Sequence, residues 1–122
     1  MPFVVEVSRP FRAVQGLSSP IASRLATGEG VRAVLRVGVA FDDGQLTARG
    51  WFFDTDAVGA LLDDWCELLA DGPWTARFDF RPTFELVARQ VFGSLAASVP
   101  QLAWVELEDI PFGTRTRYLA PT

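Results

Sequence analysis

The residue types that most often carry catalysis or bind metals are scarce in this chain. Its 122 residues include no histidine and a single cysteine, Cys66. The Ser–His–Asp and Cys–His arrangements of nucleophilic catalysis are therefore excluded within one chain. A typical zinc site is not expected, because zinc needs histidine or cysteine ligands, and no carboxylates have the spacing of a calcium-binding loop. We expect no metal and no cofactor, and we look for chemistry among carboxylate, hydroxyl, amide and aromatic side chains.

The composition indicates one globular domain over residues 1–122 and argues against several partners. The net charge of −4 and the scattered arginines argue against nucleic-acid binding, which needs a basic face. No apolar run approaches the roughly 20 residues of a membrane helix. The N-terminus lacks the layout of a signal peptide, so we expect a cytoplasmic protein. A lysine-free chain rich in alanine and arginine is typical of a GC-rich bacterial genome.

Period-two alternation of apolar residues predicts the strands of a sheet. The expected strands cover residues 3–8, 31–41, 46–53, 102–108 and 114–119. Pro10 is expected to mark a break, a bulge or an edge after the first strand, with extended structure resuming in the FRAVQ segment. An Asp-Gly pair within residues 42–45 predicts a hairpin between the second and third strands.

Two capping signals precede segments with helical spacing of apolar residues. Asp54 or Thr55 is expected to cap a first helix, which the Gly-Pro pair at 72–73 ends. Thr83 is expected to cap a second helix, which ends at the Val-Pro pair at 99–100. The order ββ(β)ααββ predicts an α+β fold, in which both helices pack on one face of an antiparallel sheet.

The order of the expected strands and helices, together with several short sequence motifs, resembles the 6-pyruvoyl-tetrahydropterin synthase and 6-carboxy-tetrahydropterin synthase family. This family has the T-fold (tunnelling fold). The resemblance covers nearly the whole chain. The matching motifs are FRAVQ at 11–15, SRLATGE at 23–29, GWFFDT at 50–55, PTFELVA at 82–88 and VELED at 105–109, followed by Tyr118. No single motif is specific, and the resemblance depends on the order of the motifs and on their spacing along the chain.

The departures from the family pattern fall on the residues that perform its chemistry. Gln15, Thr27 and Glu29 stand where the family has three zinc-binding histidines, and Ser23 stands where it has a catalytic cysteine. The family reaction uses zinc as a Lewis acid beside a carbonyl, so we do not expect this chain to perform it. The TGEG loop at 27–30 is not a phosphate site either, because it lacks the glycine spacing and lysine of a P-loop and precedes a strand.

Several positions remain candidates for a pocket that the resemblance places between subunits. Glu108 stands where the family anchors the amino-pyrimidine edge of a pterin through two hydrogen bonds, or else it is a solvated strand-end carboxylate. Glu29 is either a general base or a surface residue. Trp51 and Phe53 either narrow the pocket or serve core and oligomer packing. The expected catalytic residues are Glu29 and Glu108, and the expected substrate-binding residues are Gln15, Ser23, Thr27, Trp51, Phe53, Asp54 and Glu108.

The sequence keeps motifs of the family that it resembles but lacks the metal ligands of that family. This combination favours a metal-independent small-molecule enzyme. It would be a cyclase, isomerase or lyase of bacterial specialised metabolism that positions an apolar substrate among aromatic side chains. The alternatives are a non-catalytic binder of a pterin- or purine-like heterocycle through Glu108, and a structural subunit of a hetero-oligomer. The resemblance implies a homo-oligomer, a trimer or a hexamer, because assembly would cover the open edges of the sheet.

Overall fold

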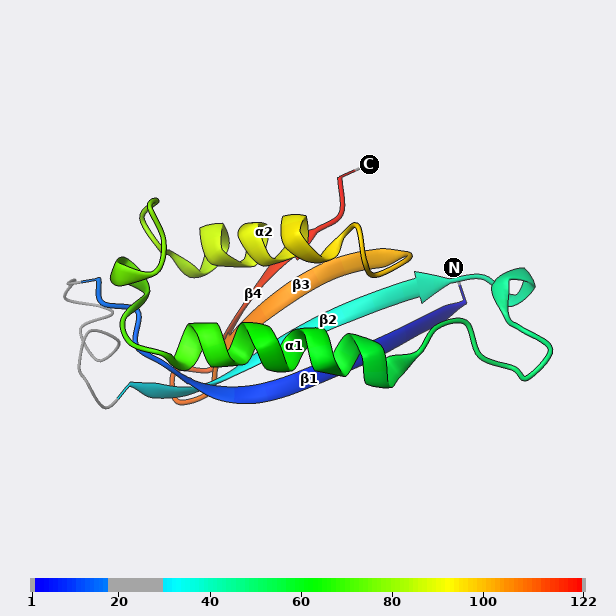
Figure 1. The fold of residues 1–122 in the computed structure, drawn as a ribbon, viewed down its shortest axis with the longest axis horizontal. Helices are drawn as coiled ribbons and strands as arrows, with labels where there is room; N and C mark the ends of the chain where they lie inside the picture. The colour runs from blue at the N-terminus through cyan, green and yellow to red at the C-terminus, as the bar shows by residue number, and fades with distance from the viewer. Residues whose placement is uncertain (1, 18–29, 122) are drawn as a thin grey trace.

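A computed structural model of the chain describes residues 2–17 and 30–121. Four antiparallel strands form one sheet in the order β1-β2-β3-β4, and helices α1 and α2 both cover the same face (Figure 1). The elements are β1 (Phe3–Ala13), β2 (Val31–Phe41), α1 (Thr55–Ala70), α2 (Phe84–Leu95), β3 (Leu102–Asp109) and β4 (Thr114–Leu119). The predicted α+β class is confirmed, with the order ββααββ.

The alternation predicted for residues 31–41 decides which side chains face the helices. Every odd position of β2 is buried, and Leu35 and Val37 pair across the sheet with Leu107 and Val105 of β3. Helix α1 packs over β1, and α2 packs over β3 and β4. Even positions of β1 and β2 point to the opposite side, which we call the helix-free face.

Pro10 does not interrupt the first strand. The pairing of β1 with β2 runs without a shift from Phe3 to Ala13, and Pro10 lies opposite Val34. Strand β1 is an edge strand, so an imide nitrogen that points away from β2 removes no hydrogen bond from the sheet. Of the three alternatives that the sequence left open for Pro10, a break, a bulge or an edge strand, the structure confirms the edge strand.

The strand predicted over residues 46–53 is wrong, and so is the hairpin that leads to it. Residues 43–45 form a single 3-10 turn, and the chain then folds back on itself, with Trp51 accepting a hydrogen bond from the Thr47 amide at 2.8 Å. Gly50, at φ +84°, supplies the left-handed residue that this turn requires. The physical reason is that β2 already has β1 on one side and β3 on the other, so a returning strand finds no free edge.

Both predicted helix caps are confirmed. The Asp54 carboxylate accepts hydrogen bonds from the amides of Asp56 (2.9 Å) and Ala57 (3.2 Å), and the Thr83 hydroxyl accepts one from the Leu86 amide (3.2 Å). Within the described ranges, no helix is long and apolar enough to cross a membrane.

Candidate functional site

The structure distributes the predicted site residues over three places. Trp51, Phe53 and Asp54 lie near the start of β1, Gln15 lies just beyond its end, and Glu108 lies on the helix-free face. Because β1 has 11 residues, its ends are roughly 33 Å apart. One chain therefore cannot bring Gln15 and Trp51 into a single pocket. Ser23, Thr27 and Glu29 lie outside the described residues, and their roles stay predictions.

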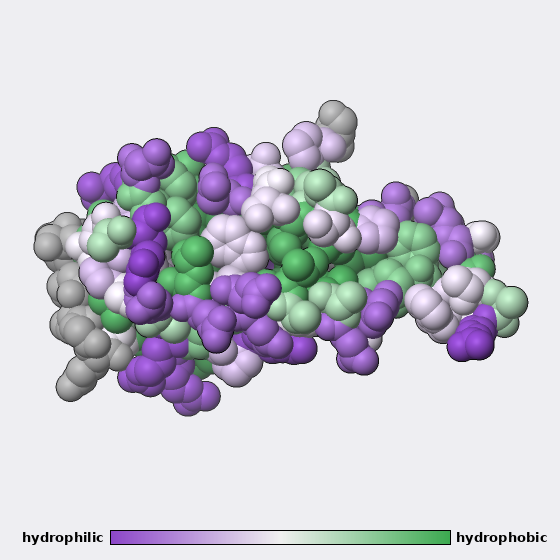
Figure 2. All heavy atoms as spheres, viewed as in Figure 1, coloured by the Kyte–Doolittle hydropathy of each residue, from purple (hydrophilic) through white to green (hydrophobic). Residues whose placement is uncertain are grey.

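The first place is a hollow that we call the aromatic pocket, between the start of β1, the end of β2 and the 46–53 segment. Its volume is about 240 Å³. Figure 2 shows apolar surface reaching this end of the molecule between charged patches. The lining residues are Phe3, Val5, Phe41, Leu46, Gly50, Trp51, Phe52, Phe53 and Thr55.

Stacked rings give the aromatic pocket a fixed wall. Phe41 stacks on Phe3 with ring centroids 5.4 Å apart and on Phe52 at 4.8 Å, while Phe53 meets Phe41 edge-on at 6.4 Å. Such offset and edge contacts stabilise aromatic clusters beyond simple burial. The Trp51 side chain differs from these rings, because 48% of its surface is exposed. A rigid wall with one large exposed ring can hold a planar apolar molecule.

The aromatic pocket has few polar groups. Among the described residues that line it, Thr55 is the one with a polar side chain other than the Trp51 indole. Asp54 adjoins the pocket, but its carboxylate is committed to the N-terminus of α1 through its bonds to the Asp56 and Ala57 amides. Among the described residues, none of those that line the pocket is a carboxylate, so the wall that they form is apolar and uncharged.

The second place contains Gln15, which is buried and uses its amide group in packing. Its Nε2 donates a hydrogen bond to the Pro82 carbonyl at 3.0 Å. This bond joins the end of β1 to the segment before α2. Among residues 2–17 and 30–121, no group of three His, Cys, Asp or Glu side chains could hold a metal ion. The substituted set Gln15, Thr27 and Glu29 also lacks the imidazole donors that zinc prefers, so these residues do not fit the family's metal.

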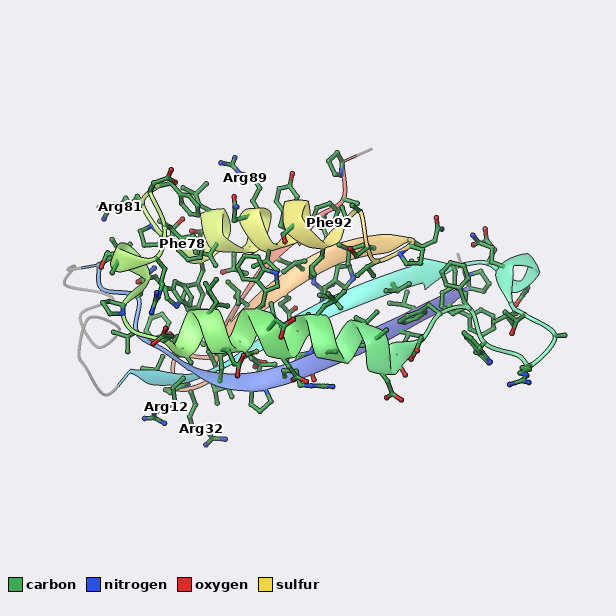
Figure 3. The ribbon with its side chains drawn as sticks, in the orientation of Figure 1. Arg12, Arg32, Phe78, Arg81, Arg89 and Phe92 are labelled. Carbon is green, nitrogen blue, oxygen red and sulfur yellow. The ribbon has the colours of Figure 1, made fainter. Side chains whose placement is uncertain are left out.

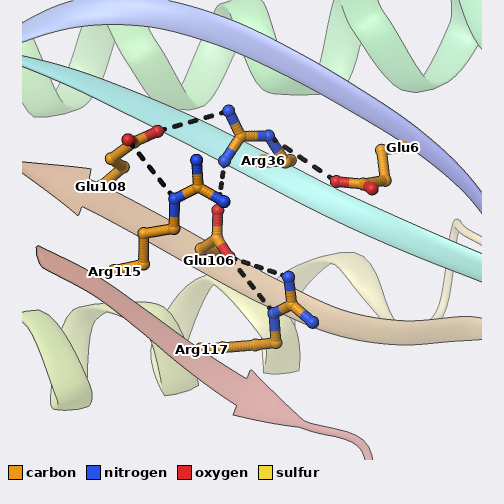
Figure 4. Close-up of polar contacts among 6 residues, drawn as sticks. All are labelled: Glu6, Arg36, Glu106, Glu108, Arg115 and Arg117. Carbon is orange, nitrogen blue, oxygen red and sulfur yellow. Dashed lines mark hydrogen bonds and ion pairs between the residues drawn. The ribbon is translucent and has the colours of Figure 1, made fainter. Parts of the chain in front are cut away.

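The third place is an ion-pair network on the helix-free face, which we call the charged network (Figure 4). Its centre is Arg36 of β2, which contacts Glu106 and lies 3.3 Å from Glu108. Glu108 also pairs with Arg115 of β4 at 3.4 Å, and Glu106 pairs with Arg117 at 2.9 Å. For Glu108 to accept two hydrogen bonds from a heterocycle, its contacts with two arginines would have to be exchanged.

Glu106 is a buried carboxylate that the sequence argument missed. It is only 1% exposed, although neither α1 nor α2 covers this face. Trp104, next to it on the same face, lies flat against Gly38, and the guanidinium of Arg117 stands 3.8 Å above the indole ring. Two signals were available, the alternation of Glu106 with apolar residues and the arginines of residues 31–41, but neither gives the register that pairs them.

The charges of the network hold Arg36 in its ionised form. Burial alone would lower the pKa of Arg36, but the hydrogen bond and charge of Glu106, followed by those of Glu108, raise it above its ordinary value. Farther along the helix-free face, Arg12 and Arg32 pair across β1 and β2, and both project away from the helices (Figure 3). Arginines therefore extend along this face from Arg12 and Arg32 as far as Arg36 and Arg117.

Asp109 is a second buried carboxylate that sequence reasoning did not single out. It is 1% exposed and lies opposite Ala33, on the side of the sheet that the helices cover. Its carboxylate accepts a hydrogen bond from the Phe112 amide at 3.2 Å, which caps the turn between β3 and β4. The available signal for this role was the position of Asp109 just before Pro111 and Gly113, residue types that are common in turns.

Comparison with known proteins identifies the fold. No protein-family model and no curated protein matches the chain. Among solved structures, the 6-pyruvoyl tetrahydropterin synthase of Caenorhabditis elegans is similar, with a TM-score of 0.70 and 18% sequence identity over 98% of this chain and 96% of that one. The T-fold predicted from the sequence is thereby confirmed, while an identity this low carries no statement about activity.

Proposed function

We propose that this protein is a metal-independent small-molecule protein of the T-fold that holds a planar, apolar molecule in the aromatic pocket. The observation that supports the proposal is the pocket itself, with its wall of stacked rings and exposed Trp51. At the packing density of protein interiors, 240 Å³ accommodates a molecule of about 10 non-hydrogen atoms, the size of a small bicyclic compound.

The reaction class that suits this pocket is one that needs positioning more than proton transfer. Since none of the described lining residues is a carboxylate, cyclisation, isomerisation or elimination would be promoted by holding the substrate in a reactive conformation. The predicted catalytic roles of Glu29 and Glu108 would then require the pocket to be shared with another copy of the chain. The predicted trimer or hexamer, the cytoplasmic location and the place in bacterial specialised metabolism remain proposals.

A direct test measures binding of naphthalene-sized aromatic probes by calorimetry and by quenching of tryptophan fluorescence. We expect Trp51→Ala to weaken binding at least tenfold, because the probe loses its exposed stacking surface. Leu68→Ala, which removes another partly exposed apolar side chain on α1, is the matched control and should leave binding unchanged. Equal binding by the wild type and Trp51→Ala would contradict the proposal.

A second candidate function is supported by the position of Glu108 between two arginines. A ligand with an amino-pyrimidine edge would displace Arg36 and Arg115 and bind the freed carboxylate. Metabolite profiles after gene deletion separate the two functions. If a Trp51→Ala strain accumulates the same compound as the deletion strain, the aromatic pocket is the site. If a Glu108→Gln strain does so and Trp51→Ala does not, the heterocycle function is favoured.

A further inference from the structure

The aromatic pocket is lined mainly by rings and lies in a strongly acidic segment of the chain. Residues 41–56 supply seven of the nine described residues that line it. The same segment contains four aspartates and one arginine, so it carries a net charge of −3, compared with −4 for the whole chain. An apolar hollow inside a negatively charged segment can distinguish molecules of equal shape by their charge.

The rings of the pocket include one that is well suited to contact a cation. Five of the nine lining residues are aromatic. Trp51 is about half exposed and, within the described ranges, contacts no other ring. The face of an aromatic ring carries partial negative charge and attracts a cation within about 6 Å of the ring centroid, and tryptophan does so most strongly. The exposed indole therefore remains available to stack on a positively charged ligand.

The charged side chains beside the pocket are mostly carboxylates. Arg49 is the one positive side chain in the segment, and the Asp54 carboxylate is partly offset by the N-terminus of α1 that it caps. Within the described ranges, Asp43 and Asp56 form no ion pair. A negative potential therefore remains beside the ring wall, and it attracts cations and repels anions. The exposed aspartates, each within two residues of a lining residue, are Asp42, Asp43, Asp54 and Asp56.

The lining also limits which kind of cation can enter. Among the described lining residues, Thr55 has the one side chain that can accept a hydrogen bond, since the Trp51 indole only donates. An ammonium or guanidinium group carries several N–H donors, and burying them without acceptors is costly. A charge delocalised over a ring has no N–H donor to satisfy, and its larger effective radius lowers the cost of removing it from water.

We infer that the aromatic pocket selects a planar organic cation without N–H donors, of the class of N-alkylated heteroaromatic rings. This inference rests on the proposed function and deepens it, because it adds a charge to the shape that the ring wall selects. Trp51 stacks on the ring of the ligand, and the neighbouring aspartates attract its charge. A neutral molecule of equal shape gains only the apolar contact. Molecules with carboxylate or phosphate groups are repelled.

Three probes of similar size test the preference for positive charge. N-Methylquinolinium and 1-methylnaphthalene share their shape and their number of non-hydrogen atoms and differ in charge, and 1-naphthoate supplies the anion. By calorimetry at low salt, we expect the cation to bind about tenfold more tightly than the neutral probe, and 1-naphthoate not to bind. Raising the salt to about 0.5 M should weaken binding of the cation several-fold and leave the neutral probe no weaker, because salt screens exposed carboxylates.

Trp51→Leu separates the electrostatic contribution of the ring from apolar contact. Leucine keeps an apolar side chain but has no aromatic face, so the cation should lose about tenfold in affinity and the neutral probe less than about threefold. Phe112→Leu is the matched control, since Phe112 is also an exposed ring and lies in the turn after β3. That turn bonds to the start of β2, whereas Phe41 of the pocket is at its end, so both affinities should stay unchanged.

A double variant, Asp43→Asn with Asp56→Asn, tests the carboxylates. It removes two charges with little change in size. At about 0.1 M salt, where the screening length is about 10 Å, the cation should bind about threefold more weakly and the neutral probe unchanged. Glu67→Gln with Glu85→Gln removes the same charge from exposed positions beyond the pocket lining and should leave both affinities unchanged.

The outcomes separate this inference from the function on which it rests. Equal affinities for the cation and the neutral probe would overturn the charge preference and leave the proposed function in place. If the wild type binds neither probe, the proposed function fails and the preference fails with it. Tighter binding of 1-naphthoate, or cation affinity that is unchanged in Trp51→Leu or in the double aspartate variant, would overturn the preference alone. Circular dichroism confirms that each variant is folded before affinities are compared.

Discussion

The two faces of the sheet bury their side chains by different means. On the covered face, apolar residues of all four strands meet α1 and α2, and the layer is hollowed at its aromatic end. On the helix-free face, Glu106 is as buried as the central leucines, although neither α1 nor α2 covers it. Arginine side chains and Trp104 lie along the sheet and supply that burial. The covered face is thus stabilised by apolar packing, and the helix-free face by charge pairing.

The largest predicted effect is a loss of stability, and it comes from removing Glu106 at the centre of the charged network on the helix-free face. Glu106→Ala leaves Arg36 partly buried beside fewer carboxylates and removes the partner of Arg117. Removing one member of a buried ion pair is strongly destabilising, so we expect the free energy of unfolding to fall by about 3 kcal/mol. Urea denaturation measures it, with Glu67→Ala on exposed α1 surface as the control. A loss under about 1 kcal/mol would show that this face is an ordinary exposed surface.

A smaller effect tests the close contact between β2 and Trp104. A Cβ atom on Gly38 would lie 2.2 Å from the Trp104 ring, so Gly38→Ala must displace the indole from beneath Arg117. We expect a loss of about 2 kcal/mol. Gly93→Ala is the matched control, since no atom lies within 4 Å of its added Cβ. Because Gly93 is inside α2, the control should stabilise the protein by up to about 1 kcal/mol. Losses of equal size in both variants would contradict the role of the Trp104 contact.

The covered face was largely predictable from the sequence, because local patterns determine it. Alternation over 31–41 and the caps at Asp54 and Thr83 act within one element, and the structure retains them. The 46–53 strand was wrong because alternation cannot report whether a neighbouring edge is free. The β1 and β3 strands already occupy both sides of β2.

The helix-free face was less predictable, because its character depends on register. The sequence shows Arg36, Glu106 and Glu108 only as alternating charges, and their burial follows from which strands pair and at which residues. The candidate site shows the same limit. Trp51 and Phe53 are close in sequence and share a pocket, whereas Gln15 and Glu108 lie in separate places.

A modest effect on stability comes from the thiol of Cys66, which is a buried residue of α1. Burial, followed by the charge of Asp63, raises the pKa of Cys66 from 9.0 to about 11. The folded protein therefore keeps a proton that the unfolded chain releases, and stability should fall as the pH rises from about 9 to about 11. The slope for this group is at most about 1.4 kcal/mol per pH unit. Urea titrations of the wild type and Cys66→Ala across this range measure it, and identical pH profiles would contradict the assignment.

The smallest predicted effect on stability separates binding from folding at the aromatic end. Trp51 is about half exposed, so Trp51→Ala should change the free energy of unfolding by less than about 1 kcal/mol. Phe53 packs edge-on against both Phe41 and Phe52, and Phe53→Ala should cost about 2 kcal/mol, because a half-buried ring is lost. Both variants should lose aromatic-probe binding, since both side chains line the pocket. If Trp51→Ala costs as much stability as Phe53→Ala, the tryptophan serves packing, and the contrast between a closed core and an open pocket on this face is lost.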